Sequence, residues 1–464
     1  MKIALVGNTV TEEALADVIH HQSPGVQVDG FPTVPNAAFS RAVDEDVPLF
    51  RITSDGELEP KTDQLPRLLS AYDARHVSGP GQLEVVEKPL NDAGQSYIGP
   101  TSAETVYEAD KTKIFEVFPP DTEVLPPTRV LETSDPDIVK EAIDDLGGDV
   151  VAKFVGDYGH HFDGSAAGRT RVLGESDPAG LREFAEQSVL DSGRILLQRY
   201  VPGRQFSYTC LLDGNGAVFR LGENICYKHR FDGETGPLCD GTGAVTIDNT
   251  VPGLVTPEDV EWITNRIVLP FRDHVERQTG RSPKTFLNID LIKASNGRLY
   301  LLEINTRAPG GNTMANLISG LETPVAEMLQ AAQEGRLSEL TPVYKRGASV
   351  VVAVFPTIYP APYAEGQDEP TLVLPKVAFD SRLRLYTGWV DVLDETSDAV
   401  TVSAKLYTTM VVSLHGPSVR TAADEIYEWL ATVVPPTTPD GFDYRRDIGA
   451  SVERSLPAGG PRSS

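Results

Sequence analysis

The chain has 464 residues, 40% of them hydrophobic, and it carries 67 acidic against 41 basic residues, a formal net charge of -26. At roughly 100 to 200 residues per domain, this length predicts about three domains. The acidic excess argues against a nucleic-acid partner, which needs a concentrated basic face, and no apolar run approaches the ~18 residues of a membrane span. The opening segment turns polar too early for a signal peptide, so we expect a cytoplasmic protein.

The first hundred residues alternate short apolar runs with helical patterns. A strand is expected over residues 3–6, and helices are expected over residues 12–21, 65–72 and 82–93. This alternation predicts an α/β unit with a mainly parallel sheet. Paired prolines at residues 119–120 and 126–127 then break the pattern and mark a linker or subdomain boundary.

A second block follows, in which β-rich runs lie close together. Its expected strands cover residues 149–154, 195–200, 207–212 and 217–221. The turns at residues 213–216 and 295–298 each separate two such runs, so this block is predicted to be α+β with antiparallel sheets. From about Ala348 a third block begins with the β-branched run at residues 349–355 and ends with a helix over residues 421–434, which is typical of a separate small domain.

One expected hairpin brings carboxylate and amide side chains together. Successive side chains of a strand alternate between its faces, so Glu303 and Asn305 project together, and the hairpin can place Asp290 beside them. Such oxygen ligands suit Mg²⁺, which takes its remaining ligands from water and nucleotide phosphates. Arg307, two residues further, supplies a cation whose planar fork suits a carboxylate or a phosphate. A solvated sheet rim is the competing interpretation.

A second group of residues is basic. Lys111 and Lys113 lie in a run expected to be helical, and Lys153 ends an apolar strand, where a buried ammonium needs an anionic partner such as phosphate. The glycine-rich residues 156–168 lack the spacing of a Walker loop, and they suit either a flap over phosphates or an ordinary solvent loop. We interpret the histidine pair at residues 160–161 as part of a loop, because no metal ligand stands at a matching spacing.

A third group combines charges and glycines in one segment. Residues 228–237 read K-H-R-F-D-G-E-T-G-P, which suits a polar small-molecule site and equally an exposed turn. With the motifs above, this segment belongs to an ordered series that resembles glycinamide ribonucleotide synthetase (phosphoribosylamine–glycine ligase) of the ATP-grasp superfamily over nearly the whole chain. The matching landmarks are residues 98–103, Lys111, Lys113, residues 151–153, Lys228, and residues 232–237, 303–307, 359–363 and 444–449.

The resemblance implies a multidomain fold of α/β and α+β parts. A Rossmann-like pre-ATP-grasp domain would cover residues 1–104, and an ATP-grasp domain would cover residues 105–345, with a lid subdomain over about residues 120–196. A small C-terminal α+β domain would follow over residues 346–454, before a disordered tail at residues 455–464. We expect a monomer or a homodimer.

The resemblance also implies roles for single residues. Lys111 and Lys153 would contact the phosphates of ATP, and adenine would lie against a hinge strand and its continuation at Gln198, Tyr200, Val201 and Gln205. Mg²⁺, or Mn²⁺ in its place, would be held by Asp290, Glu303 and Asn305. The carboxylate substrate and its acyl phosphate would be bound by Asp232, Gly233, Glu234, Thr235, Gly236 and Arg307, with Lys228 and Arg307 as the catalytic cations.

The N-terminal turn departs from the family. Where the family has G-x-G-G-R-E-H-A, a turn that binds phosphoribosylamine, this chain reads G-N-T-V-T-E-E-A at residues 7–14. We expect the carboxylate of Glu12 or Glu13 to face any phosphate bound there, a repulsion on the order of 1 kcal/mol or more per pair. The family's hinge glutamates are also replaced, by Gln198 and Arg199, and a later glutamate is replaced by Gln205.

These features predict an ATP-dependent carboxylate–amine ligase that works through an acyl phosphate, releases ADP and phosphate, and uses a specialised amino acid or amine. Its partners are then small-molecule carboxylates and amines, with no nucleic acid and no membrane. Two alternatives stay open, namely a phosphoribosylamine–glycine ligase of purine biosynthesis and a nucleotide-binding module without catalysis. The presence of Asp290, Glu303, Asn305 and Arg307 together argues against the module, because a decayed site would have no reason to keep all four.

Overall fold

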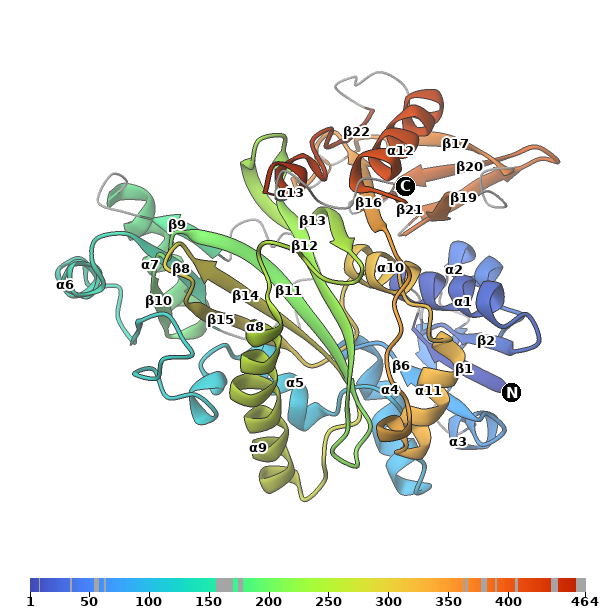
Figure 1. Cartoon of the computed structure of the whole chain (residues 1–464), viewed down its shortest axis with the longest axis horizontal. Coiled ribbons are helices and arrows are strands. Elements are labelled where there is room, and N and C mark those ends of the chain that lie inside the picture. The colour runs from blue at the N-terminus through green and yellow to red at the C-terminus, as the bar shows by residue number, and fades with distance from the viewer. Residues whose placement is uncertain are drawn as a thin grey trace.

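The computed structural model describes residues 1–7, 9–33, 36–53, 58–61, 64–155, 170–173, 178–361, 363, 366–376, 382–388, 390–404, 408–434 and 441–455. Long central strands separate the N-terminal elements from a smaller sheet on the opposite side, and the C-terminal elements lie above them (Figure 1). None of the helices within these ranges is long and apolar enough to cross a membrane.

A parallel sheet forms the N-terminal part, as predicted. Its strand order is β3 (Glu45–Asp46), β2 (Gln27–Phe31), β1 (Lys2–Val6) and β6 (Ala74–Val77). The other elements of this part are α1 (Val10–Gln22), α2 (Ala37–Ala42), α3 (Leu65–Leu69), α4 (Pro80–Asp92) and a hairpin of β4 (Phe50–Ile52) and β5 (Leu58–Pro60). The helix predicted over residues 65–72 ends early, because the ring of Tyr72 packs edge-on against Phe31 and its hydroxyl donates to Asp29 at 2.6 Å.

A second sheet, which we call the lid sheet, carries Lys153. Its strands pair antiparallel in the order β7 (Thr128–Leu131), β10 (Ile195–Arg199), β8 (Val150–Phe154) and β9 (Thr170–Leu173). Helices α6 (Pro136–Leu146) and α7 (Pro178–Ser192) pack on it around a separate apolar cluster that includes Ile143, Phe184 and Ile195. The glycine-rich residues 156–168, with the histidine pair, lie outside the described residues.

The largest sheet joins the middle of the chain to its C-terminal part. Its order is β15 (Leu299–Asn305), β14 (Phe286–Ala294), β11 (Gly203–Leu212), β12 (Val218–Phe231), β13 (Thr235–Ile247), β16 (Ala348–Pro356), β21 (Met410–Gly416) and β18 (Arg384–Tyr386), and β22 (Phe442–Tyr444) also pairs with β16. These neighbours are antiparallel, and the hairpins predicted at residues 213–216 and 295–298 are confirmed. Because β16 adds onto β13, the C-terminal block continues the central sheet. The domain boundaries remain a prediction.

Helices cover both faces of this central sheet. On one face, α8 (Pro257–Ile263), a π-helical turn (Thr264–Val268) and α9 (Leu269–Thr279) pack their apolar side chains against β11 and β14. On the other face, α10 (Gly311–Ser319) lies between the sheet and α1, and α11 (Val325–Glu334) packs near β6 of the parallel sheet (Figure 1). The N-terminal part is thereby held against the face of the central sheet that α10 covers.

Strand β12 is longer than predicted, and this changes the setting of residues 228–237. Lys228 and Arg230 lie within β12, and only the three residues between Phe231 and Thr235 connect it to β13. Tyr227 of β12 pairs with Gly243 of β13, and Phe231 pairs with Thr235. Between these two pairs β13 contains more residues than β12, so β13 forms a bulge there. Residues 232–234 form the exposed turn that the sequence allowed, and the residues on either side of it lie in paired strands.

The remaining C-terminal elements form a three-stranded sheet and two helices. The sheet has the order β17 (Thr371–Pro375), β20 (Ala399–Ala404) and β19 (Val390–Glu395). Helix α12 (Val419–Val433), which confirms the helix predicted near the end of the chain, packs on β16 and β21. Of the predicted tail, only Ser455 is described, as the last residue of α13 (Ala450–Ser455).

Candidate active site

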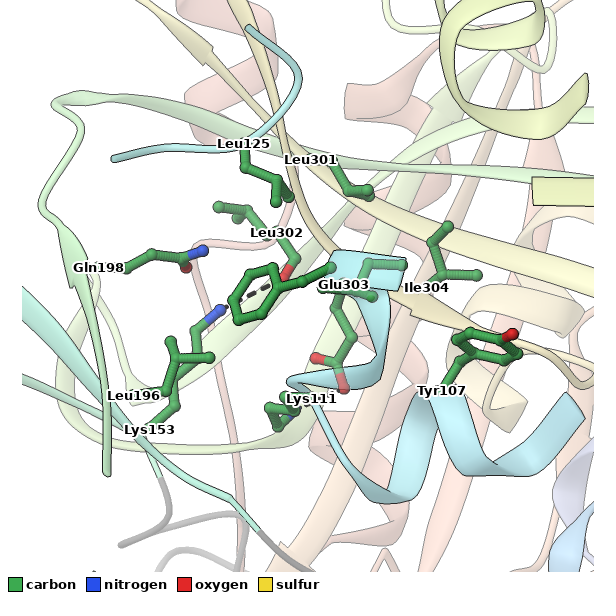
Figure 2. A pocket seen from close by; sticks show the side chains of 12 residues that line it. Tyr107, Lys111, Leu125, Lys153, Leu196, Gln198, Leu301, Leu302, Glu303 and Ile304 are labelled. Atoms are coloured by element: carbon green, nitrogen blue, oxygen red, sulfur yellow. Dashed lines mark hydrogen bonds and ion pairs between the residues drawn. The ribbon is translucent and has the colours of Figure 1, made fainter. Parts of the chain in front are cut away.

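A narrow pocket lies between the lid sheet, the segment after α5 (Ser102–Ala109) and strand β15. Lys153 and Gln198 come from the lid sheet, Lys111 from the segment after α5, and Glu303 from β15 (Figure 2). The rest of the lining is apolar or aromatic and was not predicted: Tyr107, Ile114, Phe115, Leu125, Leu196, Leu301, Leu302 and Ile304. The cavity measures about 20 Å³, room for about one water molecule.

Lys111 and Glu303 form an ion pair in this pocket, with Nζ 2.6 Å from Oε1. Burial alone would raise the pKa of Glu303, but the positive charges of Lys111, Lys153 and Lys228 outweigh burial and lower this pKa to about 2. Glu303 is therefore ionised throughout the physiological pH range, as a ligand for a divalent cation needs to be.

The helix predicted around Lys111 and Lys113 was wrong. Helix α5 ends at Ala109, and Lys113 begins a 3-10 helix after the intervening turn. Asp110 stops α5 because its carboxylate accepts hydrogen bonds within the turn, which offers the backbone an alternative to the helix. Lys113 pairs with Glu116 at 2.7 Å on the surface, so Lys111 alone of the two lines the pocket.

Lys153 extends from β8, and only 7% of the residue is exposed. Its Nζ donates to the carbonyl oxygen of Leu302 at 3.2 Å, and the carboxylates of Glu303 and Asp290 supply negative charge nearby. Burial, and then the charge of Lys111, lower the pKa of Lys153 to about 8. A bound phosphate would favour the charged ammonium again.

Asp290 and Glu303 stand opposite each other on β14 and β15, which confirms the pairing expected from the hairpin. Asn305 pairs with Asn288 further along the same ladder. Two carboxylates and an amide oxygen match the oxygen ligands that Mg²⁺ prefers. In the described part of the chain no three His, Cys, Asp or Glu side chains form a metal-binding group.

Ser207 was not predicted as part of this site. It stands opposite Asp290 on β11, and its hydroxyl donates to Oδ1 of Asp290 at 2.5 Å. Only the neighbouring position of β11 and β14 in the sheet brings these residues together. The hydroxyl therefore orients a predicted metal ligand from outside the hairpin.

Replacing Ser207 with alanine should raise the Mg²⁺ concentration for half-maximal ADP formation about 10-fold, because Asp290 loses the group that orients it. Thr209→Val is the matched control, since Thr209 donates to Asn288 at 3.1 Å between the same two strands without touching a carboxylate. A Mg²⁺ requirement that is equal in Ser207→Ala and wild type would remove Ser207 from the site.

The residues predicted to contact adenine are only partly gathered at the pocket. Gln198 lines it from β10, whereas Tyr200, Val201 and Gln205 are not among its lining residues. Strand β10 ends at Arg199, and the chain then turns toward β11. Contacts of these four side chains with a base therefore remain a prediction.

Arg307 follows β15 and is held by an acidic residue that the sequence did not indicate. Its Nε and Nη2 lie 2.9 and 2.8 Å from Oε1 of Glu108. Gly79 of the N-terminal part lies against Arg307, since a Cβ atom added to this glycine would be 3.1 Å from Cδ of Arg307. Thr11 of α1 also donates to the carbonyl oxygen of Pro309 at 3.0 Å. The segment before α4 thus lies against Arg307, and the N-terminal turn contacts Pro309, two residues further along the chain.

The expectation that Glu12 or Glu13 faces a bound phosphate was wrong. Glu12 is buried and caps α1 by accepting hydrogen bonds from the N–H and the hydroxyl of Thr9, each at 2.7 Å, and from the hydroxyl of Ser78. Glu13 is also buried and accepts from Thr387, and burial raises the pKa of both carboxyls. Glu12 moreover coincides with the glutamate of the family's own turn. The missing glycines and arginine remain the departure.

The hairpin end at residues 232–236 is bound by the C-terminal segment. The N–H of Gly233 donates to Oδ2 of Asp447 at 2.8 Å, and the guanidinium of Arg445 donates to Glu234 at 2.9 Å. Lys228, on the same hairpin, lies close enough to Glu303 for its charge to lower that pKa. The substrate contacts predicted for residues 232–236 and Lys228 stay a prediction.

No protein-family model matches the chain. Curated relatives carry the name phosphoribosylamine–glycine ligase. The relative from Leptospira interrogans is 25% identical over 293 residues, which are 62% of this chain and 64% of the relative, so the match spans less than two thirds of that protein. The relative from Streptococcus pyogenes is 26% identical over 372 residues, which are 79% of this chain and 80% of the relative.

Solved structures resemble the fold over almost the whole chain. Phosphoribosylamine–glycine ligase from Thermotoga maritima has a TM-score of 0.70 at 18% identity and covers 97% of this chain and 100% of its own. The biotin carboxylase domain of 2-oxoglutarate carboxylase from Hydrogenobacter thermophilus, solved with MgADP, ADP and bicarbonate, has a TM-score of 0.62 at 16% identity, with coverages of 93% and 90%.

The chain shares the fold of these two structures over almost its whole length, which confirms the predicted multidomain fold of α/β and α+β parts. Within that fold class it resembles the phosphoribosylamine–glycine ligases, both in sequence and in the arrangement of its parts.

Proposed function

We propose that this protein is an ATP-dependent ligase that joins a carboxylate to an amine through an acyl phosphate and releases ADP and phosphate. The observation that carries the proposal is the ion pair of Lys111 and Glu303 beside Lys153, between the lid sheet and β15. Two cations next to an ionised carboxylate can neutralise nucleotide phosphates and hold a divalent cation at the same place. The ATP-grasp fold and the names of the curated relatives support the same class.

Phosphorylation of the carboxylate comes first. A carboxylate oxygen attacks the γ-phosphorus of ATP, the bond from this phosphorus to the β–γ bridging oxygen breaks, and ADP leaves. Lys111 and Lys153 bind phosphate oxygens and offset their charge. Asp290, Glu303 and Asn305 would hold Mg²⁺ or Mn²⁺, which would supply further charge neutralisation. Arg307 orients the substrate carboxylate through its planar guanidinium.

Amide formation follows at the acyl carbon. The nitrogen of the amine attacks this carbon, the bond between carbon and the phosphate oxygen breaks, and phosphate leaves while the nitrogen loses a proton. Lys228 and the hairpin end at residues 232–236 hold the acyl phosphate, and the amine enters from the side of the N-terminal turn, whose Thr11 donates to the carbonyl oxygen of Pro309. The protein positions and shields the reactants, so no serine or cysteine nucleophile takes part.

Synthesis of glycinamide ribonucleotide is the second candidate, because the Streptococcus pyogenes relative of that activity matches 79% of this chain. Thr9, Val10 and Thr11 stand where that family has two glycines and an arginine. An acceptor other than phosphoribosylamine, such as a specialised amino acid or amine, therefore fits this N-terminal turn better.

A screen of carboxylic acids with amines, read as ADP release, tests the proposal. Hydroxylamine serves as a general amine, because it traps an acyl phosphate as a hydroxamate. We expect ADP, phosphate and amide in equal amounts, and AMP with pyrophosphate would overturn the mechanism. Glycine with phosphoribosylamine forms one arm of the screen and decides between the two candidates. ATP binding without turnover of any pair would favour a module without catalysis.

A further inference from the structure

A second, open cavity lies at the end of β12, against the segment that begins with β22. It measures about 230 Å³ and is lined by Arg230, Phe231, Asp232 and residues 443–446. This lining contains three arginines and two aspartates, on a chain whose formal net charge is -26. The cavity is separate from the pocket that holds Lys111 and Lys153.

Arg230 is the buried cation of this cavity, at 1% exposure. Its Nε donates to the carbonyl oxygen of Tyr359 at 3.0 Å, and its Nη1 donates to Oδ2 of Asp443 at 3.3 Å. Its Nη2 is buried and has no hydrogen-bond partner among the residues that the structure describes. The guanidinium lies over the rings of Phe231 and Phe355, 5.2 and 5.4 Å from their centroids. A buried donor without an acceptor is unfavourable, and an anionic ligand would supply the acceptor.

The carboxylates around the cavity are already shared among its arginines. Asp443 accepts from Arg446 at 3.0 Å as well as from Arg230. Arg445 is paired with Glu234 and Asp447, at 2.9 and 2.7 Å. Arg230 and Arg446 therefore share the carboxylate of Asp443, while Glu234 and Asp447 offset the charge of Arg445.

The cavity lies on the same side of β12 as the candidate active site. Lys228 and Arg230 are two residues apart on β12. Because the extra residues of the irregular pairing lie on β13, the alternation of β12 is kept, and both side chains project from one face of this strand. Two residues of a strand span about 7 Å. Lys228 is the cation that the proposed function assigns to the acyl phosphate. One small molecule can therefore contact both Lys228 and Arg230 along this face of β12.

Resting on the proposed ligase function, we propose that this cavity binds a second carboxylate group, carried by a substrate whose other end reacts beside Lys228 and Glu303. A guanidinium presents parallel N–H donors that match the two oxygens of a carboxylate. The cavity is below the usual range of about 300 to 1,000 Å³ for whole ligands, so it suits one group of a longer molecule. Phe231 and Tyr444 line it with aromatic rings that can cover a short hydrocarbon link. The substrate class is a small dicarboxylic acid, or an amino-acid acceptor bound by its carboxylate.

Calorimetric titration without ATP tests the site directly, with malonate, succinate, glutarate and adipate against propionate as the single-carboxylate reference. We expect at least one dicarboxylate to bind about 10-fold tighter than propionate to the wild type. Arg230→Met should abolish this preference, and Arg446→Ala should reduce it. Arg420→Ala is the matched control, because this exposed arginine of the same C-terminal part pairs with Glu453 at 3.5 Å, away from the cavity, and should keep the preference.

Measurements of KM distinguish whether the second carboxylate belongs to the acid substrate or to the amine acceptor. If it belongs to the acid, Arg230→Met raises the KM of the dicarboxylate with hydroxylamine as the amine. If it belongs to the acceptor, the variant raises the KM of an amino acid and leaves that of the corresponding amino-acid amide unchanged.

Equal affinities for all five acids, together with an unchanged KM for amino acids in Arg230→Met, would overturn the proposal. A preference that survives both Arg230→Met and Arg446→Ala would overturn it as well. If Arg230→Met does not fold, the comparison of Arg446→Ala with Arg420→Ala decides. Arginine-dependent binding of dicarboxylates without ADP formation from any substrate pair would leave the cavity in place and refute the ligase instead.

Discussion

Replacing Glu303 with glutamine should lower the rate of ADP formation on the order of 1000-fold. The amide is uncharged, so the predicted Mg²⁺ site loses one of its two carboxylates. Lys111, Lys153 and Lys228 also lose the anion that they surround, and the variant should therefore melt at a lower temperature than the wild type. ADP release at saturating ATP and a thermal melt measure the two effects.

Asp259→Asn is the matched control for this variant. Asp259 pairs with Lys293 of β14 in the same sheet, and the two side chains are 13% and 18% exposed, against 26% and 14% for Glu303 and Lys111. This control should lose stability and keep its rate of ADP formation. A Glu303→Gln enzyme that retains more than about a tenth of the wild-type rate would be incompatible with a metal ligand at this position.

Replacing Lys153 with methionine should raise the melting temperature and weaken ATP binding about 10-fold or more. Methionine fills a similar volume without a charge, so the burial that lowers the pKa of Lys153 to about 8 no longer opposes folding. The phosphates lose a buried cation at the same time. Lys140→Met, on the exposed surface of α6, is the control and should change neither quantity. An unaltered affinity for ATP in Lys153→Met would exclude a phosphate contact.

Lys153 also predicts a pH dependence of stability and binding. Its pKa is about 8 in the folded protein, below the ordinary value of 10.5. Below pH 8 the ammonium is charged in both states, and the folded state bears the full effect of burial. Between about pH 8 and 10.5 the folded protein releases this proton first, so Lys153 becomes less destabilising as the pH rises. ATP affinity should fall over the same range, and neither trend should appear in Lys153→Met. Melting curves and calorimetry from pH 7 to 10 compare the two proteins.

The hairpin of β14 and β15 could be predicted because its information is local. A four-residue turn brings the two strands together, and the alternation of side chains places Glu303 and Asn305 on one face. The register shift between Asp290 and Leu291, which sets Asp290 opposite Glu303, is a feature that only the structure shows. The parallel N-terminal sheet was predictable for a similar reason, since alternating strand and helix patterns admit few other arrangements.

Contacts between distant segments could not be predicted in this way. Ser207 meets Asp290 because β11 pairs with β14, and Glu108 meets Arg307 because α5 packs beside β15. Glu12 turned out to cap its own helix. In each case the residue type allows several partners, and sheet order and burial select one of them.

The sequence by itself determined the class of fold, the oxygen-rich hairpin and the series of basic residues, because strand periodicity, turn residues and motif order depend on neighbouring positions. The tertiary structure decided how these residues are used. It placed Lys111 rather than Lys113 at the pocket, lowered the pKa of Glu303 by gathering lysines from three separate segments, and buried Arg230 against Asp443, more than 200 residues away. Burial and the pairing of remote strands determine electrostatics of this kind, and no local pattern in the chain encodes them.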